Sequence, residues 1–448
     1  MKIVLVGAGS AQFGCGTLGD IFCSKQLQGS EVSLLDINET ALDKVYTIAK
    51  EFVAQNKLDF TITATTDRKK AFKDAKFIIS SIEVGDRFKL WDEDWKVGLQ
   101  YGYKQVYGEN GGPGGVFHSL RITKVVLDIV KDAMDICPDA YIFNYSNPMT
   151  AICTTVLRAF PQAKFIGMCH EIGWLYNWLP KILSMPIDDI QFRAAGLNHF
   201  SCMLEAKNAK TGQDLYPDVL KKAPAFFEYE QGYSDMLERF KETGSAEMTE
   251  AYEKKTGGKS AYKWADRTLL KFVLENYKLL PITVDSHFGE YVSWAWEVSD
   301  HKGILDFYEF YKTSLPNGEA KIELKTHERS IPIIDGILTN SGYEEAAVNI
   351  LNNGILKELP DWIAIECPAI IDNRGLTGIP LETPKGYAAL LRNYCGVYDL
   401  TAEAVIHGSK DYAIQAMLAS PIVTHCNAVK PMVEYMIHQQ EKWLGYLK

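Results

Sequence analysis

The chain has 448 residues, which is more than one simple core accommodates, so two domains are expected. Its composition, 47% hydrophobic and 23% charged residues, is typical of a soluble globular protein. The net charge of −10 and the lack of a basic run argue against a nucleic-acid partner. No signal peptide or long apolar segment is apparent, which predicts a cytoplasmic protein without membrane contact. The 9 scattered cysteines are expected to be reduced.

The first part of the chain alternates strand-like and helix-like segments. Continuous apolar runs predict buried strands at residues 2–7, 31–36, 76–82, 140–143 and 164–168. Apolar residues at helical spacing predict helices at residues 17–26, 40–53 and 120–134. Strands that alternate with helices predict an α/β fold, with a Rossmann-like doubly wound sheet over residues 1–195.

The pattern changes after residue 195. Longer helical segments are predicted at residues 234–242 and 268–277, and an alternating run predicts a strand at residues 361–371. We therefore predict a mixed α+β domain over residues 196–448, which carries the substrate, metal and subunit contacts. No low-complexity linker separates the two domains, which favours close packing between them.

A glycine turn after the first predicted strand indicates nucleotide binding. In Gly7-Ala8-Gly9-Ser10, the glycines let backbone N–H groups approach a pyrophosphate at a helix N-terminus. Asp36 ends the second strand, where a carboxylate accepts hydrogen bonds from the ribose hydroxyls of NAD and repels the 2′-phosphate of NADP. Gln12 stands where the usual fingerprint has a third glycine, so an ordinary strand–turn–helix connection is the alternative.

Two loop segments are further candidates for ligand contact. Asn144 and Asn147 follow a predicted strand, and we predict that Asn144 faces the nicotinamide and that Asn147 binds substrate hydroxyls. Residues 111–115 (GGPGG) form a sharply punctuated loop before a helix, where the backbone could approach a ligand closely. The alternative for both segments is ordinary turn chemistry.

Two short segments could together hold a divalent metal ion. Cys169 follows one predicted strand, and His199 follows a weaker apolar run about thirty residues later. A thiolate and an imidazole suit a borderline divalent ion. Either residue alone could equally be a buried structural side chain.

These segments resemble glycoside hydrolase family 4, the NAD- and Mn-dependent glycosidases. The resemblance extends over the whole chain, through KIVLVGAGS, LLDI, GGPGGVFHSLR, NYSNPM, GMCHEIGW, AAGLNHF, DSHFGEYVSW and IECPAIIDNRG. It implies a two-domain architecture like that of lactate and malate dehydrogenases. It also implies NAD and Mn²⁺, or another divalent metal, as cofactors.

The resemblance also indicates the class of substrate. Cys169-His170 is the pattern of members that act on unphosphorylated α-glycosides, and GGPGG and NYSNPM look most like the α-galactosidase branch. α-Glucosidases and α-uronidases share the Cys-His pattern and remain alternatives. The DSHFGEY segment is one residue shorter than its counterpart in α-galactosidases, which leaves the sugar open.

The mechanism that the resemblance implies is a redox-assisted elimination. NAD⁺ oxidises C3 of the sugar, and a metal ion held by Cys169 and His199 stabilises the charge that forms when C2 loses its proton. The aglycone then leaves, water adds, and the hydride returns. Family spacing makes Tyr262 the first candidate for the C2 base and Asp266 the second, with Lys263 or Arg267 as the activating cation. His170 is a candidate acid or substrate contact.

Two rival functions share some of these features. A hydroxy-acid dehydrogenase has the same first domain but would produce NADH, and no His/Asp relay with substrate-binding arginines is evident. A non-catalytic NAD-binding subunit would have no use for Cys169. The family resemblance implies a homodimer or homotetramer, although no assembly motif is visible in the sequence.

Overall fold

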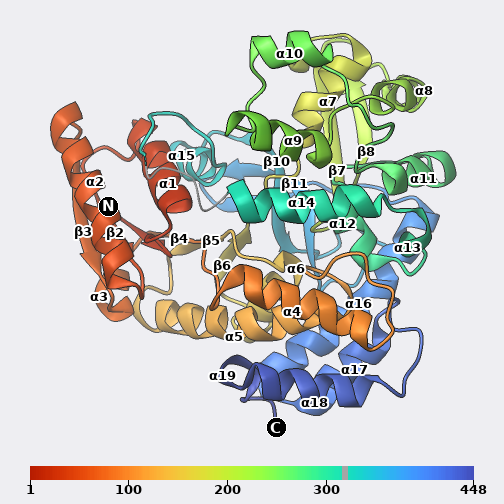
Figure 1. The fold of residues 1–448 in the computed structure, drawn as a ribbon. Helices are drawn as coiled ribbons and strands as arrows, with labels where there is room; N and C mark the ends of the chain where they lie inside the picture. Colours follow the sequence, from red (N-terminus) through yellow and green to blue (C-terminus); the bar gives the residue numbers. More distant parts are fainter. Residues whose placement is uncertain (315–320) are drawn as a thin grey trace.

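One twelve-stranded sheet runs through the part of the chain that this computed structural model describes, residues 1–314 and 321–448 (Figure 1). The strand order is β3-β2-β1-β4-β5-β6-β10-β11-β7-β8-β9, and β12 pairs with β11. Helices cover both faces. The fold class predicted from the sequence is confirmed.

The first six strands are parallel and have the order of a dinucleotide-binding domain. Their bounds are β1 Lys2–Val6, β2 Ser30–Leu35, β3 Phe60–Thr65, β4 Phe77–Ser80, β5 Tyr141–Asn144 and β6 Lys164–Gly167. β3 has no counterpart among the predicted strands. Its sequence, FTITAT, alternates because it is an edge strand that buries only part of its surface, so it lacks the continuous apolar run used to find the others.

Most of the helices of this half follow one of these strands in the chain. The helices are α1 Ala11–Cys23, α2 Glu39–Asn56, α3 Arg68–Phe72, α4 Arg87–Gln100, α5 Gly112–Ile136, α6 Met149–Ala159 and α7 Gly173–Leu183. The predicted loop at residues 111–115 is mostly helical, because α5 already begins at Gly112. Pro113 lies in the first turn, where its fixed φ suits a helix and no N–H is needed.

The second half extends the same sheet with antiparallel strands. These are β7 Ile190–Leu197, β8 Phe200–Asn208, β9 Leu280–Pro281, β10 Tyr343–Leu351, β11 Ala364–Asp372 and β12 Gly375–Gly378. β10 joins the two halves by pairing Asn349 with Gly167 of β6. The tight connection between β7 and β8 carries Asn198 and His199, so the predicted metal ligand lies at the tip of this hairpin.

The remaining helices form two groups and one separate helix, α15 Ser330–Thr339. One group lies over the end of the sheet that carries β7 and β8, and consists of α8 Tyr216–Phe227, α9 Tyr233–Thr243, α10 Glu250–Thr256, α11 Thr268–Tyr277, α12 Asp285–Phe288, α13 Ala295–Val298 and α14 His301–Ser314. α15 lies beside α1 (Figure 1). The C-terminal group packs against α4, α5 and α6, and consists of α16 Lys385–His407, α17 Lys410–Ala419, α18 Val429–Gln439 and α19 Glu441–Leu444. Among the described residues, no helix is long and apolar enough to cross a membrane.

Candidate active site

A cavity of about 800 Å³ opens at the carboxyl ends of β1, β2 and β4. Gly7, Ser10 and Asp36 line it, as predicted for a nucleotide site. Gly7 has a φ of +84°, and a Cβ there would lie 2.1 Å from the carbonyl oxygen of Ser81, so only glycine fits the turn. The Gly9 N–H donates to Asp36 Oδ2 at 2.8 Å, which fixes the carboxylate beside the turn.

The two predicted asparagines have different positions. Asn147 lines the cavity, and its Nδ2 lies 3.4 Å from Glu109 Oε1, whereas its buried Oδ1 has no partner. Asn144 is completely buried and lines neither cavity. Its Nδ2 donates to the Ser146 carbonyl oxygen at 2.9 Å. That Asn144 faces the nicotinamide stays a prediction: its Nδ2 braces the turn after β5, whereas its buried Oδ1 has no partner.

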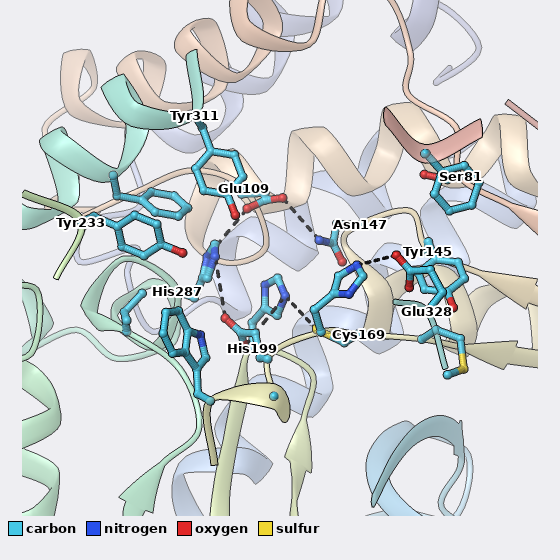
Figure 2. Close-up of a pocket in the computed structure, with 18 of the residues that line it drawn as sticks. Ser81, Glu109, Tyr145, Asn147, Cys169, His199, Tyr233, His287, Tyr311 and Glu328 are labelled. Atoms are coloured by element: carbon cyan, nitrogen blue, oxygen red, sulfur yellow. Dashed lines mark hydrogen bonds and ion pairs between the residues drawn. The ribbon is translucent and has the colours of Figure 1, made fainter. Parts of the chain in front are cut away.

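A second cavity, of about 830 Å³, adjoins the first and contains both predicted metal ligands (Figure 2). Cys169 Sγ lies 3.4 Å from His199 Nε2, although the residues are 30 positions apart. His199 adopts a left-handed backbone conformation, with φ of +63°, in the β7–β8 turn. Residues with positive φ are uncommon outside glycine and concentrate at functional sites.

Carboxylates and a second imidazole complete the surroundings of this pair. Cys169, Glu171 and His199 form one group whose candidate ligand atoms lie within 4.8 Å of one another, and Glu109, His199 and His287 form another. Glu171 Oε2 lies 3.9 Å from His199 Nε2 and has no hydrogen-bond partner. The rings of His199 and His287 stack with 4.4 Å between their centroids. Sulfur, nitrogen and carboxylate oxygen together are a donor set that fits a divalent transition metal.

A buried carboxylate holds the loop before α5 against this cluster. Glu290 Oε1 accepts hydrogen bonds from the N–H groups of Glu109, at 2.5 Å, and Asn110, at 2.9 Å. The Asn110 amide lies 2.8 Å from His199 Nδ1 and so orients the ring from behind. Metal binding through Nε2 needs a proton on Nδ1. Asn110 Nδ2 is the atom that faces Nδ1 as placed, and a half-turn of the amide brings its unpartnered Oδ1 there to accept that proton.

Burial controls the protonation of the cluster when no metal is bound. Desolvation, followed by the neighbouring His287, holds the pKa of His199 well below its ordinary value, and burial also lowers the pKa of His287. Burial raises the pKa of Glu171 and of Cys169 well above their ordinary values. The imidazoles are therefore neutral and able to bind a metal, whereas the thiol gives up its proton only as a cation binds.

His170 extends from the metal-ligand segment toward the nucleotide side. Its side chain is 69% exposed in the cavity, and Nε2 lies 3.5 Å from Glu328 Oε1. The Tyr145 ring lies 5.9 Å from the His170 ring, and its hydroxyl accepts from the Ser330 N–H at 3.2 Å. The predicted acid or substrate contact is thus accessible and has a carboxylate beside it.

The two predicted bases lie outside the described lining of this cavity. The Tyr262 hydroxyl donates to Glu238 Oε1 at 2.6 Å on the surface, and this bond raises the pKa of Tyr262 when a base would need it lowered. Asp266 is completely buried and neither of its carboxylate oxygens has a hydrogen-bond partner. The proposed activating cations are also engaged elsewhere: Lys263 pairs with Glu228, and Arg267 lies over the Trp178 ring.

Several lining residues have no assigned role in the sequence analysis, namely Glu109, Glu171, Tyr233, His287 and Tyr311. Glu171 and His287 belong to the segments GMCHEIGW and DSHFGEYVSW. The sequence therefore marked both segments as part of the site, but it did not predict which residues these two side chains contact. Tyr233, Tyr311 and Glu109 have no local signal, because distant helices and a loop bring them to the cavity.

The comparisons with known proteins identify the family. The family model described as family 4 glycosyl hydrolase matches residues 2–185, and that of the family 4 glycosyl hydrolase C-terminal domain matches residues 194–423. An α-glucosidase of Erwinia rhapontici is 56% identical over 450 residues, which cover 100% of this chain and 99% of that protein. An α-galactosidase of Bacillus subtilis (strain 168) is 29% identical, over 94% of this chain and 93% of that protein.

A solved structure supports the fold independently. It is a 6-phospho-α-glucosidase from gut microorganisms in complex with NAD and Mn²⁺, with a TM-score of 0.75 and 19% identity, covering 100% of this chain and 99% of that one. At this identity, the likeness is one of fold. The two family models together with the 56% identical relative place the sequence in one family. The chain belongs to the family 4 glycosyl hydrolases.

Proposed function

We propose that this protein is an NAD- and divalent-metal-dependent α-glucosidase that acts on unphosphorylated α-glucosides. The 56% identity to an α-glucosidase over the full chain is the observation that carries the proposal. It favours the glucosidase alternative over the α-galactosidase reading of GGPGG and NYSNPM, since the α-galactosidase relative is only 29% identical.

The residues of the two cavities fit the cofactors. Gly7, Ser10 and Asp36 line the first cavity and would hold NAD, with Gly9 hydrogen-bonded to Asp36. Cys169 and His199, with Glu171 beside them, would hold Mn²⁺. The unpartnered Glu171 Oε2 is an oxygen donor of the kind that Mn²⁺ prefers. When bound, the nucleotide exchanges a hydride with the sugar and the metal ion acts as a Lewis acid on sugar oxygens.

Three residues of this chain would act on the sugar itself. Asn147 would bind a hydroxyl group through its unpartnered Oδ1. We propose Tyr233 as the group that takes the C2 proton, because its hydroxyl points into the cavity beside His287 (Figure 2). Burial raises the pKa of Tyr233 well above its ordinary value in the metal-free protein, and a cation held at Cys169 and His199 would lower it. His170, on the nucleotide side of Cys169, would bind a sugar hydroxyl as a substrate contact.

The charges of the catalytic cavity favour a neutral sugar. Among the described lining residues, Arg87 is the one Lys or Arg side chain, and the acids are Glu109, Glu171 and Glu328. Arg87 is already engaged, with Glu83 Oε2 at 3.6 Å and the Trp91 ring at 4.2 Å. A sugar phosphate would therefore meet net negative charge and no free cation.

The experiment is release of p-nitrophenol from p-nitrophenyl α-glucoside by reduced protein, with NAD⁺ and Mn²⁺ together and with each omitted. We expect hydrolysis that requires both cofactors and accumulates no NADH. The α-galactoside, α-glucuronide and 6-phospho-α-glucoside are the matched substrates. Preference for any of these would overturn the α-glucoside assignment, and net NADH formation from a hydroxy acid would overturn the glycosidase.

A further inference from the structure

Helix α7 presents its first turn to the catalytic cavity, directly after the metal-ligand segment. Gly173, Trp174 and Asn177 of this turn line the cavity, yet the proposed function gives them no role. They lie on one helix that begins only four residues after Cys169. A ligand held at Cys169 and His199 would therefore extend within reach of them.

This turn lies on the side of the metal ligands opposite the nucleotide. The two cavities share a wall formed by Ser10, Ser81, Arg87, Glu109, Tyr145 and Asn147. Figure 2 shows Ser81 and Tyr145 on one side of Cys169 and His199, and Tyr233 on the other. Trp174 belongs to the Tyr233 side, because the two rings meet edge to face with 6.5 Å between centroids.

The order of the carbon atoms in the sugar ring predicts which part of the substrate lies at the turn of α7. C3 must face the nicotinamide, and C2 must lie near the metal ligands. C1 and the group attached to it follow next around the ring, so the leaving group points away from the nucleotide wall. That direction leads to the turn of α7.

The side chains of the turn suit a sugar ring. One face of Trp174 stacks on the buried Trp178, with 5.3 Å between centroids, and this contact holds the indole in place while its remaining surface lines the cavity. Indoles bind the apolar C–H face of a pyranose, and nearby amides bind its hydroxyls. Asn177 is exposed on the same face of the helix, and its Nδ2 donates to the Gly173 carbonyl oxygen at 3.1 Å.

There is also empty space where the second ring would lie. A Cβ added to Gly173 would meet no heavy atom within 4 Å. The glycines that start α5 are crowded by contrast: a Cβ on Gly114 would lie 2.7 Å from the Gly108 Cα. The absence of a side chain at Gly173 thus keeps the cavity open beside Trp174.

We infer that Gly173, Trp174 and Asn177 form a binding subsite for the second sugar unit of an α-linked disaccharide. The inference rests on the proposed function and specifies its substrate class. The leaving group is a pyranose or furanose held against Trp174, and the enzyme therefore prefers disaccharides to glucosides with a small leaving group.

The test compares two substrates that differ only in the leaving group, maltose and α-glucosyl fluoride. Trp174→Ala is expected to lower kcat/KM for maltose about tenfold, the upper range for an aromatic contact, and to leave glucosyl fluoride within about twofold. Trp174→Phe, which keeps a ring, is expected to retain most of the maltose activity. Trp362→Ala, at a partly exposed tryptophan outside the described cavity lining, is the control and should change neither substrate.

A second variant fills the space instead of removing the ring. Gly173→Leu is expected to raise the KM for maltose at least about tenfold and to spare glucosyl fluoride, because the leucine occupies only the leaving-group side. NAD⁺ affinity, measured by fluorescence, verifies that each variant is folded.

The outcomes separate the two proposals. Equal losses on both substrates, or no loss on maltose in either variant, would overturn the subsite while the glucosidase stands. Wild-type protein that hydrolyses neither substrate with both cofactors present would overturn the proposed function, and the subsite with it.

Discussion

Glu171 combines burial with an incomplete set of hydrogen bonds. Oε1 accepts from the Thr283 hydroxyl, whereas Oε2 faces His199 without a partner. Burial raises the pKa of Glu171 well above its ordinary value of 4.5, so the metal-free protein either holds an extra proton or buries a charge. Glu171 therefore destabilises the metal-free folded protein at neutral pH, and a bound cation would offset this destabilisation.

Glu171→Gln should separate stability from metal binding. Because the folded-state pKa is raised, the cost of Glu171 grows as pH rises above 4.5 toward the folded value. The variant without metal should thus be more stable at pH 8, by about 1–3 kcal/mol, and should match wild type near pH 4. Its Mn²⁺ affinity should fall at least about tenfold. Thermal unfolding at both pH values and calorimetric Mn²⁺ titration measure these effects; a variant less stable at pH 8 would contradict this role.

Tyr233 and Tyr262 offer a matched comparison for the base. Tyr233→Phe should lower kcat by about 10²–10⁴, the usual contribution of a general base, and should abolish deuterium incorporation at C2 of the product in D₂O. Tyr262→Phe should retain both, because its hydroxyl bonds to Glu238 outside the described cavity lining. A large loss in Tyr262→Phe with an active Tyr233→Phe would reverse the assignment.

Residue patterns pointed to Cys169 and His199, whose side chains the structure brings together, but not to Tyr233, and the difference has a physical reason. Cys169 and His199 each come just after a strand with an apolar run, so a local pattern marks both positions, even though β10 and β11 lie between β6 and β7 in the sheet. Tyr262 lies in an irregular segment between α10 and α11, whose path depends on packing. Tyr233 begins a helix that packs against α14, so only the tertiary structure turns it toward the cavity.

At the scale of secondary-structure elements, the β1–α1 turn requires glycine at position 7. Gly7→Ala should weaken NAD⁺ binding strongly and destabilise the fold, because its φ is positive and the added methyl group would strike the Ser81 carbonyl. Gly396→Ala is the control in helix α16: it meets nothing within 4 Å and should stabilise the protein by about 0.5–1 kcal/mol. NADH fluorescence titration and thermal unfolding provide the two readouts. Unchanged NAD⁺ affinity in Gly7→Ala would show that the turn does not hold the nucleotide.

Elements whose apolar residues repeat at a regular spacing were predictable from the sequence. Elements whose position depends on neighbouring elements were not. The α11 helix begins and ends where its apolar spacing predicts, at residues 268–277. The edge strand β3 was missed because partial burial replaces the continuous apolar run by alternation. β10 joins the nucleotide half only through pairing with β6, a contact that no local pattern encodes.

At the scale of the whole molecule, the continuous sheet ties both predicted domains into one unit. β6 and β10 pair across the boundary at residue 195, and α16 packs on α5 and α6. We expect a single cooperative unfolding transition, with coincident midpoints by circular dichroism and tryptophan fluorescence. Two separated transitions would show that residues 1–195 fold independently. The homodimer or homotetramer implied by the family stays a prediction, which light scattering tests.

The wall shared by the two cavities has a kinetic consequence. A glycoside seated at Cys169 and His199 would cover the nicotinamide end of the nucleotide behind Asn147 and Tyr145. Binding should therefore follow a compulsory order, nucleotide first, and one nucleotide molecule should serve many turnovers. In a pulse-chase experiment, labelled NAD⁺ already on the enzyme should stay there through repeated cycles despite excess unlabelled NAD⁺; a release of label that keeps pace with hydrolysis would refute this order. The nucleotide then stays bound to the enzyme, and it is reduced and reoxidised within each turnover.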